Sequence, residues 1–383
     1  MVRASTAPDL SSDGLTSLER AKRNKLMLGL FIPLQQGAWS PSTAPRGTHW
    51  GFEYNAECTV RAEEFGFDLA FGLAHWLPKG GFGGAMEFRE NTTDPLLVTA
   101  GLAPLTKNIL LISTVHILYR WHPVMLAKFA ATLDHMTRGR WGLNMVTGFR
   151  PVESKMFGME QFEHDKRYQM AGEFTEIMVK LWEGSEDLDF QGDFYKTERG
   201  WIAPKPVNGR PIIVNAGSSG AGLQYAAKYS DLLFLTSPAG HDIEKACEAL
   251  PAHNAKVKAL GREYGRDLKT LINPHVICRE TEKEAREQMQ AIIDHQDPVA
   301  TDNYYATFSG GDQASWKNTK RDDWVVGGNV HVVGSPEQVA DWLIKLNDAG
   351  CDGVQLNFYD YLPDLEFFGE RVIPLLKQAG VRC

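Results

Sequence analysis

The sequence predicts an α/β fold, a (β/α)₈ barrel with an insertion near its C-terminal third. Eight short apolar runs, each about as long as a buried strand, alternate with segments of helical periodicity along the 383 residues. No change in composition marks a second domain, and a chain of this length fits one barrel with insertions. Continuous apolar runs are typical of parallel strands, because helices cover both faces of such a sheet.

The apolar runs that predict strands begin near residues 26, 67, 109, 140, 211, 231, 271 and 353. Two of the intervening helices have clear start signals. Asp94 and Pro95 provide an N-cap and an N1 proline, and residues 335–338 read Ser-Pro-Glu-Gln, which is a capping box. Residues 1–24 are polar and lack the apolar segment of a secretory signal. They are predicted to form a flexible leader, with the barrel occupying residues 25–383.

Residues 297–328 interrupt the alternation of strands and helices. This segment is polar and aromatic, and it contains Tyr304, Tyr305, Trp316 and Trp324. A long stretch without secondary structure inside a compact domain is typically a functional lid or an insertion. The sequence therefore predicts a lid at about 297–328.

Charge and cysteine content exclude several classes of protein. The net charge of −8 and the pI near 5.8 argue against nucleic acid or an anionic membrane as the main partner. No apolar run approaches the ~20 residues of a membrane span. The five cysteines are scattered without a Cys-x-x-Cys pair, so no metal site is predicted, and they fit the reducing cytoplasm.

Active sites of such barrels lie where the strands end, at their C-terminal side. The polar residues at these ends are His75, Thr114, His116, Asn144, Thr147, Ser218 and Ser219. They provide amide, hydroxyl and imidazole groups but no clustered carboxylates. Such a set suits neither a metal nor a two-carboxylate hydrolase, and it fits a large, mostly apolar ligand with several hydrogen-bonding edges.

Asn144 lies inside one of the apolar runs. A buried amide costs free energy unless it has a partner, so either the protein satisfies Asn144 or the side chain faces a ligand. Both interpretations remain open from the run alone.

Residues 215–220 read Asn-Ala-Gly-Ser-Ser-Gly, follow a strand and open a helix. The free N–H groups of a helix start, with two hydroxyls, can bind a phosphate; the alternative is an N-cap turn without a ligand. The order of glycines does not match a dinucleotide fingerprint. Arg167 and Tyr168 begin another helix, where arginine suits a phosphate and tyrosine a phosphate or a ring; the alternative is a solvated helix start. The glycine-rich loop 80–84 is either a plain connection or, through Phe82, one apolar wall of a pocket.

A series of short motifs occurs in a fixed order along the chain. They lie at 81–84, 130–134, 140–148, 164–168, 190–195, 216–219 and 368–375. With these motifs the chain resembles the bacterial luciferase-like flavin-dependent monooxygenases, from residue 26 to about 376. Within that family it is most similar to the branch of the pyrimidine oxygenases and the dimethyl sulfone monooxygenases.

This resemblance implies a site and a chemistry. It places FMN against Ala74, His75, Thr114, Asn144, Glu153, Arg167, Tyr168, Gly217, Ser218 and Ser219. Thr114, Asn144 and His75 are the expected catalytic residues, with Thr114 and Asn144 lining the pocket where O₂ meets the reduced flavin and a flavin peroxide forms. A separate NAD(P)H-dependent reductase is expected to supply the reduced FMN, and relatives commonly form homodimers or homotetramers.

The substrate expected from the resemblance is a small N-heterocycle or amide, such as a pyrimidine, cleaved at a C–N bond. The pyrimidine oxygenases carry lysine where His75 stands, and the loop that follows is longer here, so this loop is expected to set specificity. The alternatives are a dialkyl sulfone, a riboflavin-type substrate, a deazaflavin-dependent dehydrogenase on the same barrel, or a non-catalytic flavin-binding protein.

Overall fold

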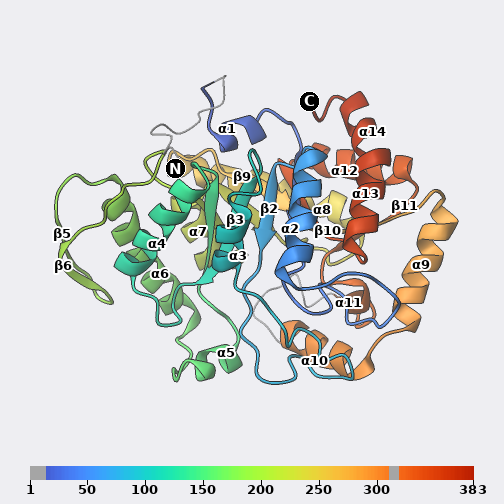
Figure 1. Cartoon of the computed structure of the whole chain (residues 1–383), viewed down its shortest axis with the longest axis horizontal. Helices are drawn as coiled ribbons and strands as arrows, with labels where there is room; N and C mark the ends of the chain where they lie inside the picture. The colour runs from blue at the N-terminus through green and yellow to red at the C-terminus, as the bar shows by residue number, and fades with distance from the viewer. Residues whose placement is uncertain (1–13, 310–318) are drawn as a thin grey trace, which may run out of the picture.

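All eight predicted strands form one closed parallel barrel in the structure, a computed structural model that describes residues 14–309 and 319–383 (Figure 1). The strands follow the order β1-β12-β9-β8-β7-β4-β3-β2 around the barrel. Their bounds are β1 Met27–Phe31, β2 Leu69–Gly72, β3 Leu110–His116, β4 Trp141–Val146, β7 Ile212–Asn215, β8 Leu232–Leu235, β9 Lys269–Ile272 and β12 Gly353–Leu356. The (β/α)₈ prediction is confirmed.

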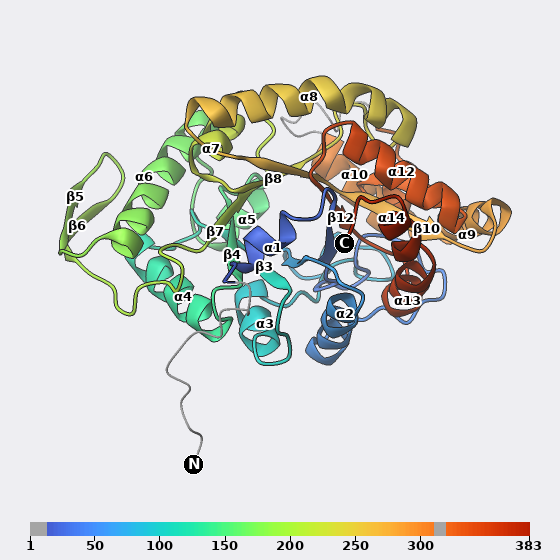
Figure 2. The same cartoon turned by 90° about the horizontal axis from the view of Figure 1, so that it is seen from above.

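Helices surround the barrel, as the view from above shows (Figure 2). They are α2 Phe52–Glu64, α3 Pro95–Leu102, α4 Pro123–Met136, α6 His164–Glu183, α7 Gly220–Tyr229, α8 Ile243–Glu263, α9 Glu282–Asp294, α12 Pro336–Asp348, α13 Tyr361–Arg371 and α14 Ile373–Gln378. Both predicted start signals operate. The Asp94 carboxylate accepts from the backbone of Leu96 and Leu97, and Ser335 forms a capping box with Gln338. Within the described residues, none of the helices has the length and apolar character to cross a bilayer.

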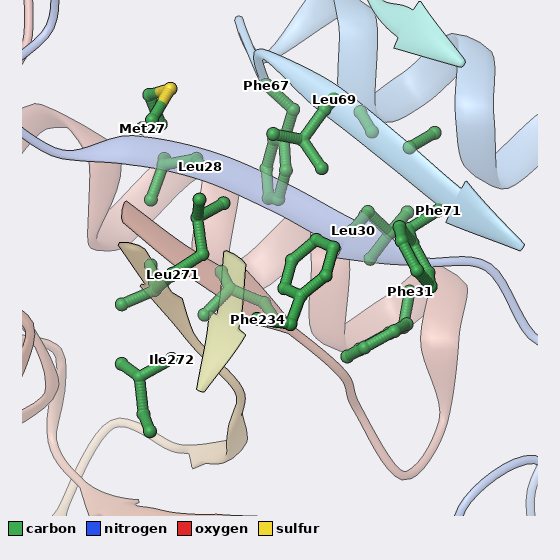
Figure 3. Close-up of a cluster of buried hydrophobic side chains, with 14 of the residues drawn as sticks. Met27, Leu28, Leu30, Phe31, Phe67, Leu69, Phe71, Phe234, Leu271 and Ile272 are labelled. Atoms are coloured by element: carbon green, nitrogen blue, oxygen red, sulfur yellow. The ribbon is translucent and has the colours of Figure 1, made fainter. Parts of the chain in front are cut away.

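The interior of the barrel is filled by apolar side chains from neighbouring strands (Figure 3). Phe31, Phe71 and Phe234 come from three different strands and meet near the strands' C-terminal ends. The ring centroids of Phe31 and Phe71 are 5.1 Å apart, and those of Phe71 and Phe234 are 4.6 Å apart. Edge-to-face contacts of this kind add to the stability that burial provides. These three rings form an apolar floor on which any site at the barrel mouth must rest.

The apolar run at 271–278 divides into two strands, contrary to the prediction of a single one. After β9 the chain leaves the barrel at Asn273, and β10 (Pro274–Cys278) pairs in parallel with β11 (Val330–Gly334) outside it. This pairing joins segments far apart in the sequence, so no local pattern announces it. The hairpin of β5 (Leu188–Gln191) and β6 (Lys196–Gly200) was also not predicted.

The predicted leader and lid both contain helices. Helix α1 (Ser17–Ala21) lies within the leader and starts with a capping box from Thr16, whereas residues 1–13 lie outside the described part of the chain. In the described parts of the lid, 297–309 and 319–328, the chain forms α10 (Pro298–Ser309) and α11 (Asp323–Val326), where no secondary structure was expected. Asp297 explains the helix start, since its carboxylate accepts from the backbone of Ala300.

Loops and short helices gather at one end of the barrel. Figure 1 shows α10 and α5 (Pro151–Met156) at this end, whereas α1 and the C-terminus lie at the other. Helix α5 follows β4 directly, so the crowded end is the one where the strands terminate. Trp316, part of the predicted lid, lies outside the described residues.

Candidate active site

Two adjoining cavities occupy the mouth of the barrel at the C-terminal ends of the strands. The inner cavity measures about 240 Å³ and rests on the floor of Phe31, Phe71 and Phe234. The outer cavity measures about 920 Å³ and is bounded by the glycine-rich loop, α5, the start of α7 and α10. Phe149, Arg150 and Tyr168 line both, so the two cavities can hold different parts of one ligand.

Thr114 and Asn144 form a buried pair at the bottom of the inner cavity. They are direct neighbours in the register of β3 and β4, and the Asn144 Nδ2 donates to Thr114 Oγ1 over 2.9 Å. The Asn144 Oδ1 has no partner among the described residues, although the side chain is 1% exposed. A buried amide oxygen without a partner points to a ligand. This geometry therefore favours the ligand-facing interpretation of Asn144 over a satisfied core amide.

His75 is held by an arginine that the sequence did not single out. The Arg150 Nη2 donates to His75 Nδ1 over 2.9 Å, so the ring proton resides on Nε2. That Nε2 has no partner within the described chain, and His75 lines the inner cavity. Burial, reinforced by Arg89 and Arg150, lowers the pKa of His75 well below its usual value. His75 is thus a neutral imidazole that offers a fixed N–H donor.

Glu153 acts on the site through Arg150. Its carboxylate is fully buried, lies 3.1 Å from the Arg150 Nη2 and accepts a hydrogen bond from the Tyr119 hydroxyl at 2.9 Å. The backbone N–H of Trp76 donates to it from 3.4 Å. Glu153 lines neither cavity and balances the charge of Arg150. Its expected contact with FMN stays a prediction.

The start of α7 forms a cradle at the edge of the outer cavity. Ser218, Ser219, Arg167 and Tyr168 all line this cavity. Ser219 is the N-cap of α7 and accepts from the backbone of Gly222 at 3.1 Å. Its hydroxyl also interacts with Tyr168. Free N–H groups and the helix dipole favour an anion at such a position.

Glycines at the cradle let the Tyr168 ring approach the turn. A Cβ on Gly217 would lie 2.8 Å from Asn215 Oδ1, and one on Gly222 would lie 2.7 Å from the Tyr168 hydroxyl. The nearby Arg167 donates through Nη1 to the Gly148 carbonyl, while its Nε has no partner in the described residues. The motifs at 164–168 and 216–219, remote in sequence, therefore build one surface.

The structure brings together all of the predicted residues except Glu153, which supports the site from behind. Ala74 lines the inner cavity beside His75, and Gly217 lines it from the turn before α7. Two arginines that the sequence analysis missed, Arg89 and Arg150, line the same cavity. Arg150 could have been found from its position just after a strand end. Arg89 carries no such signal, because its place depends on how the 75–92 loop folds.

His116 and His275 are buried imidazoles, and they predict acid sensitivity. Burial lowers the pKa of His116 to about 4 and that of His275 to about 3. The unfolded chain takes up these protons near pH 6.5, so stability is full above that pH and is lost as the pH falls. We expect the free energy of unfolding to drop by about 2 kcal/mol per histidine between pH 7 and pH 5.

Urea titrations of wild type and His275→Gln at pH 7 and pH 5 would measure this loss. The variant should lose less stability than the wild type over the interval. Equal pH dependence of wild type and His275→Gln would contradict the prediction.

Comparison with known proteins agrees with the barrel and with the cavities at its mouth. The chain is 32% identical over 362 residues to the pyrimidine monooxygenase RutA of Acinetobacter baylyi, covering 92% of this chain and 95% of the relative. It is 29% identical over 362 residues to the FMNH₂-dependent dimethylsulfone monooxygenase of Pseudomonas fluorescens, with the same coverage. A solved structure of riboflavin lyase with modified FMN and substrate riboflavin superimposes with a TM-score of 0.82 at 25% identity, covering 94% of this chain and 92% of the other.

A family model described as luciferase-like monooxygenase matches residues 27–353, which span the barrel from its first strand to its last. Together with the relatives, this match defines the class of the protein as a flavin-dependent monooxygenase. The chain belongs to the luciferase-like monooxygenase family.

Proposed function

We propose that this chain is the oxygenase of a two-component system, which uses O₂ and reduced FMN to cleave a C–N bond in a small N-heterocycle or amide. A separate NAD(P)H-dependent reductase would supply the reduced FMN. The observation that carries the proposal is the Thr114–Asn144 pair: its amide oxygen has no partner among the described residues, and the pair lines a cavity that adjoins the anion cradle. Two relatives also support the proposal, since one is named a pyrimidine monooxygenase and the other an FMNH₂-dependent monooxygenase.

The residues present fit FMN. Ser218, Ser219, Arg167 and Tyr168 would hold its phosphate, because they meet at the N-terminus of α7 beside the outer cavity. Its ring system would lie mainly in the outer cavity and reach the inner one only by its edge, where polar atoms without partners among the described residues are found. Its contacts there would be Ala74, His75, Thr114, Asn144 and Gly217. Bound reduced FMN supplies the electrons for activating O₂.

The side chains around the inner cavity have distinct tasks. The Thr114 hydroxyl accepts from Asn144, which leaves its own proton free to donate to a developing negative charge. His75 presents a second donor, Nε2–H, kept in place by Arg150. Tyr304, Phe308 and Trp324 from the two lid helices also line the cavity and keep water from it.

The lining of the inner cavity favours a planar heterocycle. Three aromatic rings form its floor, and amide groups from Asn215, Asn273 and Asn329 also line it. The Asn329 Nδ2 has no partner in the described part of the chain. A flat ring with N–H and C=O edges matches these groups better than a sulfone does. A riboflavin-type substrate is the second candidate, because the outer cavity of about 920 Å³ could accept a molecule of that size.

Single-turnover oxidation would test the proposal. In each reaction, protein with chemically reduced FMN is mixed with ¹⁸O₂ and one candidate substrate: uracil, dimethyl sulfone or riboflavin. The products are analysed by mass spectrometry. We expect ¹⁸O in a ring-opened product of uracil. Label in the sulfone or riboflavin product alone would contradict the choice of substrate. Tighter binding of a deazaflavin than of FMN would instead indicate a dehydrogenase.

A change at the cradle should separate FMN from riboflavin. We expect Ser219→Ala to weaken FMN binding about tenfold, because one hydrogen bond to the phosphate is lost, and to leave riboflavin binding unchanged. Fluorescence titration of both flavins measures this difference. Ser335→Ala is the matched control, since it removes an N-cap of α12 away from both cavities. An equal loss of affinity for both flavins would argue against a phosphate at Ser219.

A further inference from the structure

We propose that Arg89 is the anion-binding group of the inner cavity, and that the substrate is a planar heterocycle carrying a carboxylate. This inference rests on the proposed function and narrows its substrate class. Arg89 belongs to the loop between β2 and α3, is 1% exposed, and lines the inner cavity. It does not line the outer cavity, where the cofactor phosphate is expected.

The loop holds Arg89 in an unusual backbone conformation. Its φ is 63°, in the left-handed region that residues with a side chain rarely adopt. The backbone is fixed there by its N–H, which donates to the Gln36 carbonyl over 3.1 Å. A Cβ on Gly81 would lie 2.2 Å from the Phe88 carbonyl oxygen, so the loop closes tightly behind it. Strain maintained by so many contacts is typical of functional positions.

The guanidinium of Arg89 has donors to spare. Its Nε donates to the Ala38 carbonyl and its Nη2 to the Tyr304 hydroxyl, each over 3.1 Å. A guanidinium has further N–H groups, and no other acceptor for them exists among the described residues. They remain available to a ligand in the cavity.

Arg89 also has no acidic partner within the described chain. The groups that act on it through space are the neutral hydroxyls of Tyr304 and Tyr361 and the like charge of Arg150. Burial lowers its pKa, which expresses the free energy required to keep the cation away from water. Arg150 differs in this respect, because Glu153 neutralises it. A buried cation without a counter-charge is energetically unfavourable, and an anionic ligand would neutralise it.

Aromatic rings surround the Arg89 guanidinium. Its central carbon lies 4.7 Å from the ring centroid of Tyr304, 5.0 Å from Phe88 and 5.2 Å from Trp39. The ring faces stabilise a cation but do not neutralise it. They also keep the guanidinium from turning, so that its planar edge can meet the two oxygens of a carboxylate. The neighbouring floor of Phe31, Phe71 and Phe234 would accept the ring that bears this carboxylate.

Calorimetric titration of the holoenzyme with oxidised FMN tests the assignment without turnover. The probes are uracil-6-carboxylate and uracil-6-carboxamide, which share size and ring but differ in charge. We expect the wild type to bind the carboxylate at least about tenfold more tightly. Arg89→Met should reduce carboxylate affinity by about tenfold to a hundredfold and barely affect the carboxamide, with Arg89→Lys in between. Arg61→Met is the matched control, because it removes an arginine stacked over a ring, Phe65, at an exposed position.

Three results would overturn the assignment. They are equal affinity of the wild type for the two probes, an unchanged preference in Arg89→Met, and loss of FMN rather than carboxylate binding in that variant. If Arg89→Met does not fold, the wild-type comparison and Arg89→Lys still decide. A carboxylate preference without any ¹⁸O-labelled product would leave this inference standing and refute the oxidation proposed above.

Discussion

Replacing Glu153 by alanine is expected to lower the free energy of unfolding by about 3–5 kcal/mol. The carboxylate is wholly buried and is the partner of Arg150, whose own side chain is 5% exposed. Removing it leaves the guanidinium buried without a counter-charge, and the Tyr119 hydroxyl loses its acceptor. Urea unfolding followed by circular dichroism measures the loss, and His75 should lose its fixed orientation at the same time.

Glu64→Ala provides the matched control for this prediction. Glu64 forms an ion pair with Arg61 on the surface of α2, where solvent surrounds both groups. Exposed pairs of this kind contribute little to stability, so the control should unfold at nearly the same urea concentration as the wild type. If Glu153→Ala behaved like the control, the charge balance assigned to Glu153 would be wrong.

The second large effect is expected for Thr114→Val. Valine has nearly the shape of threonine, so the substitution removes the hydroxyl while the cavity keeps its form. We expect product formation per reduced FMN consumed to fall by about a hundredfold, because the donor to the developing charge is lost. Hydrogen peroxide should appear in place of product, and FMN affinity should stay nearly constant. Product and hydrogen peroxide are quantified together after mixing the reduced holoenzyme with O₂ and substrate.

Thr99→Val separates this effect from general damage. Thr99 has a buried hydroxyl that lies 2.8 Å from Ser113 Oγ. Ser113 precedes Thr114 in β3, and its side chain points out of the barrel toward α3. Its removal costs stability but does not touch either cavity. The control should therefore keep normal coupling. Undiminished coupling in Thr114→Val would remove Thr114 from the proposed mechanism.

The barrel could be predicted because each of its strands is buried on both faces, which produces a recognisable apolar run. The division between β9 and β10 could not, since the sequence there stays apolar on both sides of Asn273 and β10 finds its partner, β11, far along the chain. Helix α10 was missed for a related reason. Its polar and aromatic composition is unusual, and its inner face packs against a loop that contains Phe82 and Phe88 and against Trp324 of α11, all remote from it in sequence.

The residues of the candidate site likewise fall into those that the sequence could predict and those that it could not. Thr114 and Asn144 could be placed together, because parallel strands end at one rim and the two residues face each other in register. The anion cradle followed from a local motif at a helix start. Arg150 could have been found because it follows a strand end, whereas Arg89 required the loop conformation itself, with a left-handed backbone that no residue pattern announces. The sequence therefore located groups at strand ends and helix starts, and the structure added Arg89, whose place depends on a folded loop.

Asp297 links the glycine-rich loop to α10. One carboxylate oxygen accepts from the Met86 backbone at 3.1 Å, and the other accepts from Ala300 in the first turn of the helix, also at 3.1 Å. A Cβ on Gly84 would lie 2.2 Å from this carboxylate. The two positions are therefore expected to change together during evolution. Any opening that lifts the loop also uncaps the helix, so entry of the substrate and fraying of α10 should share one activation barrier.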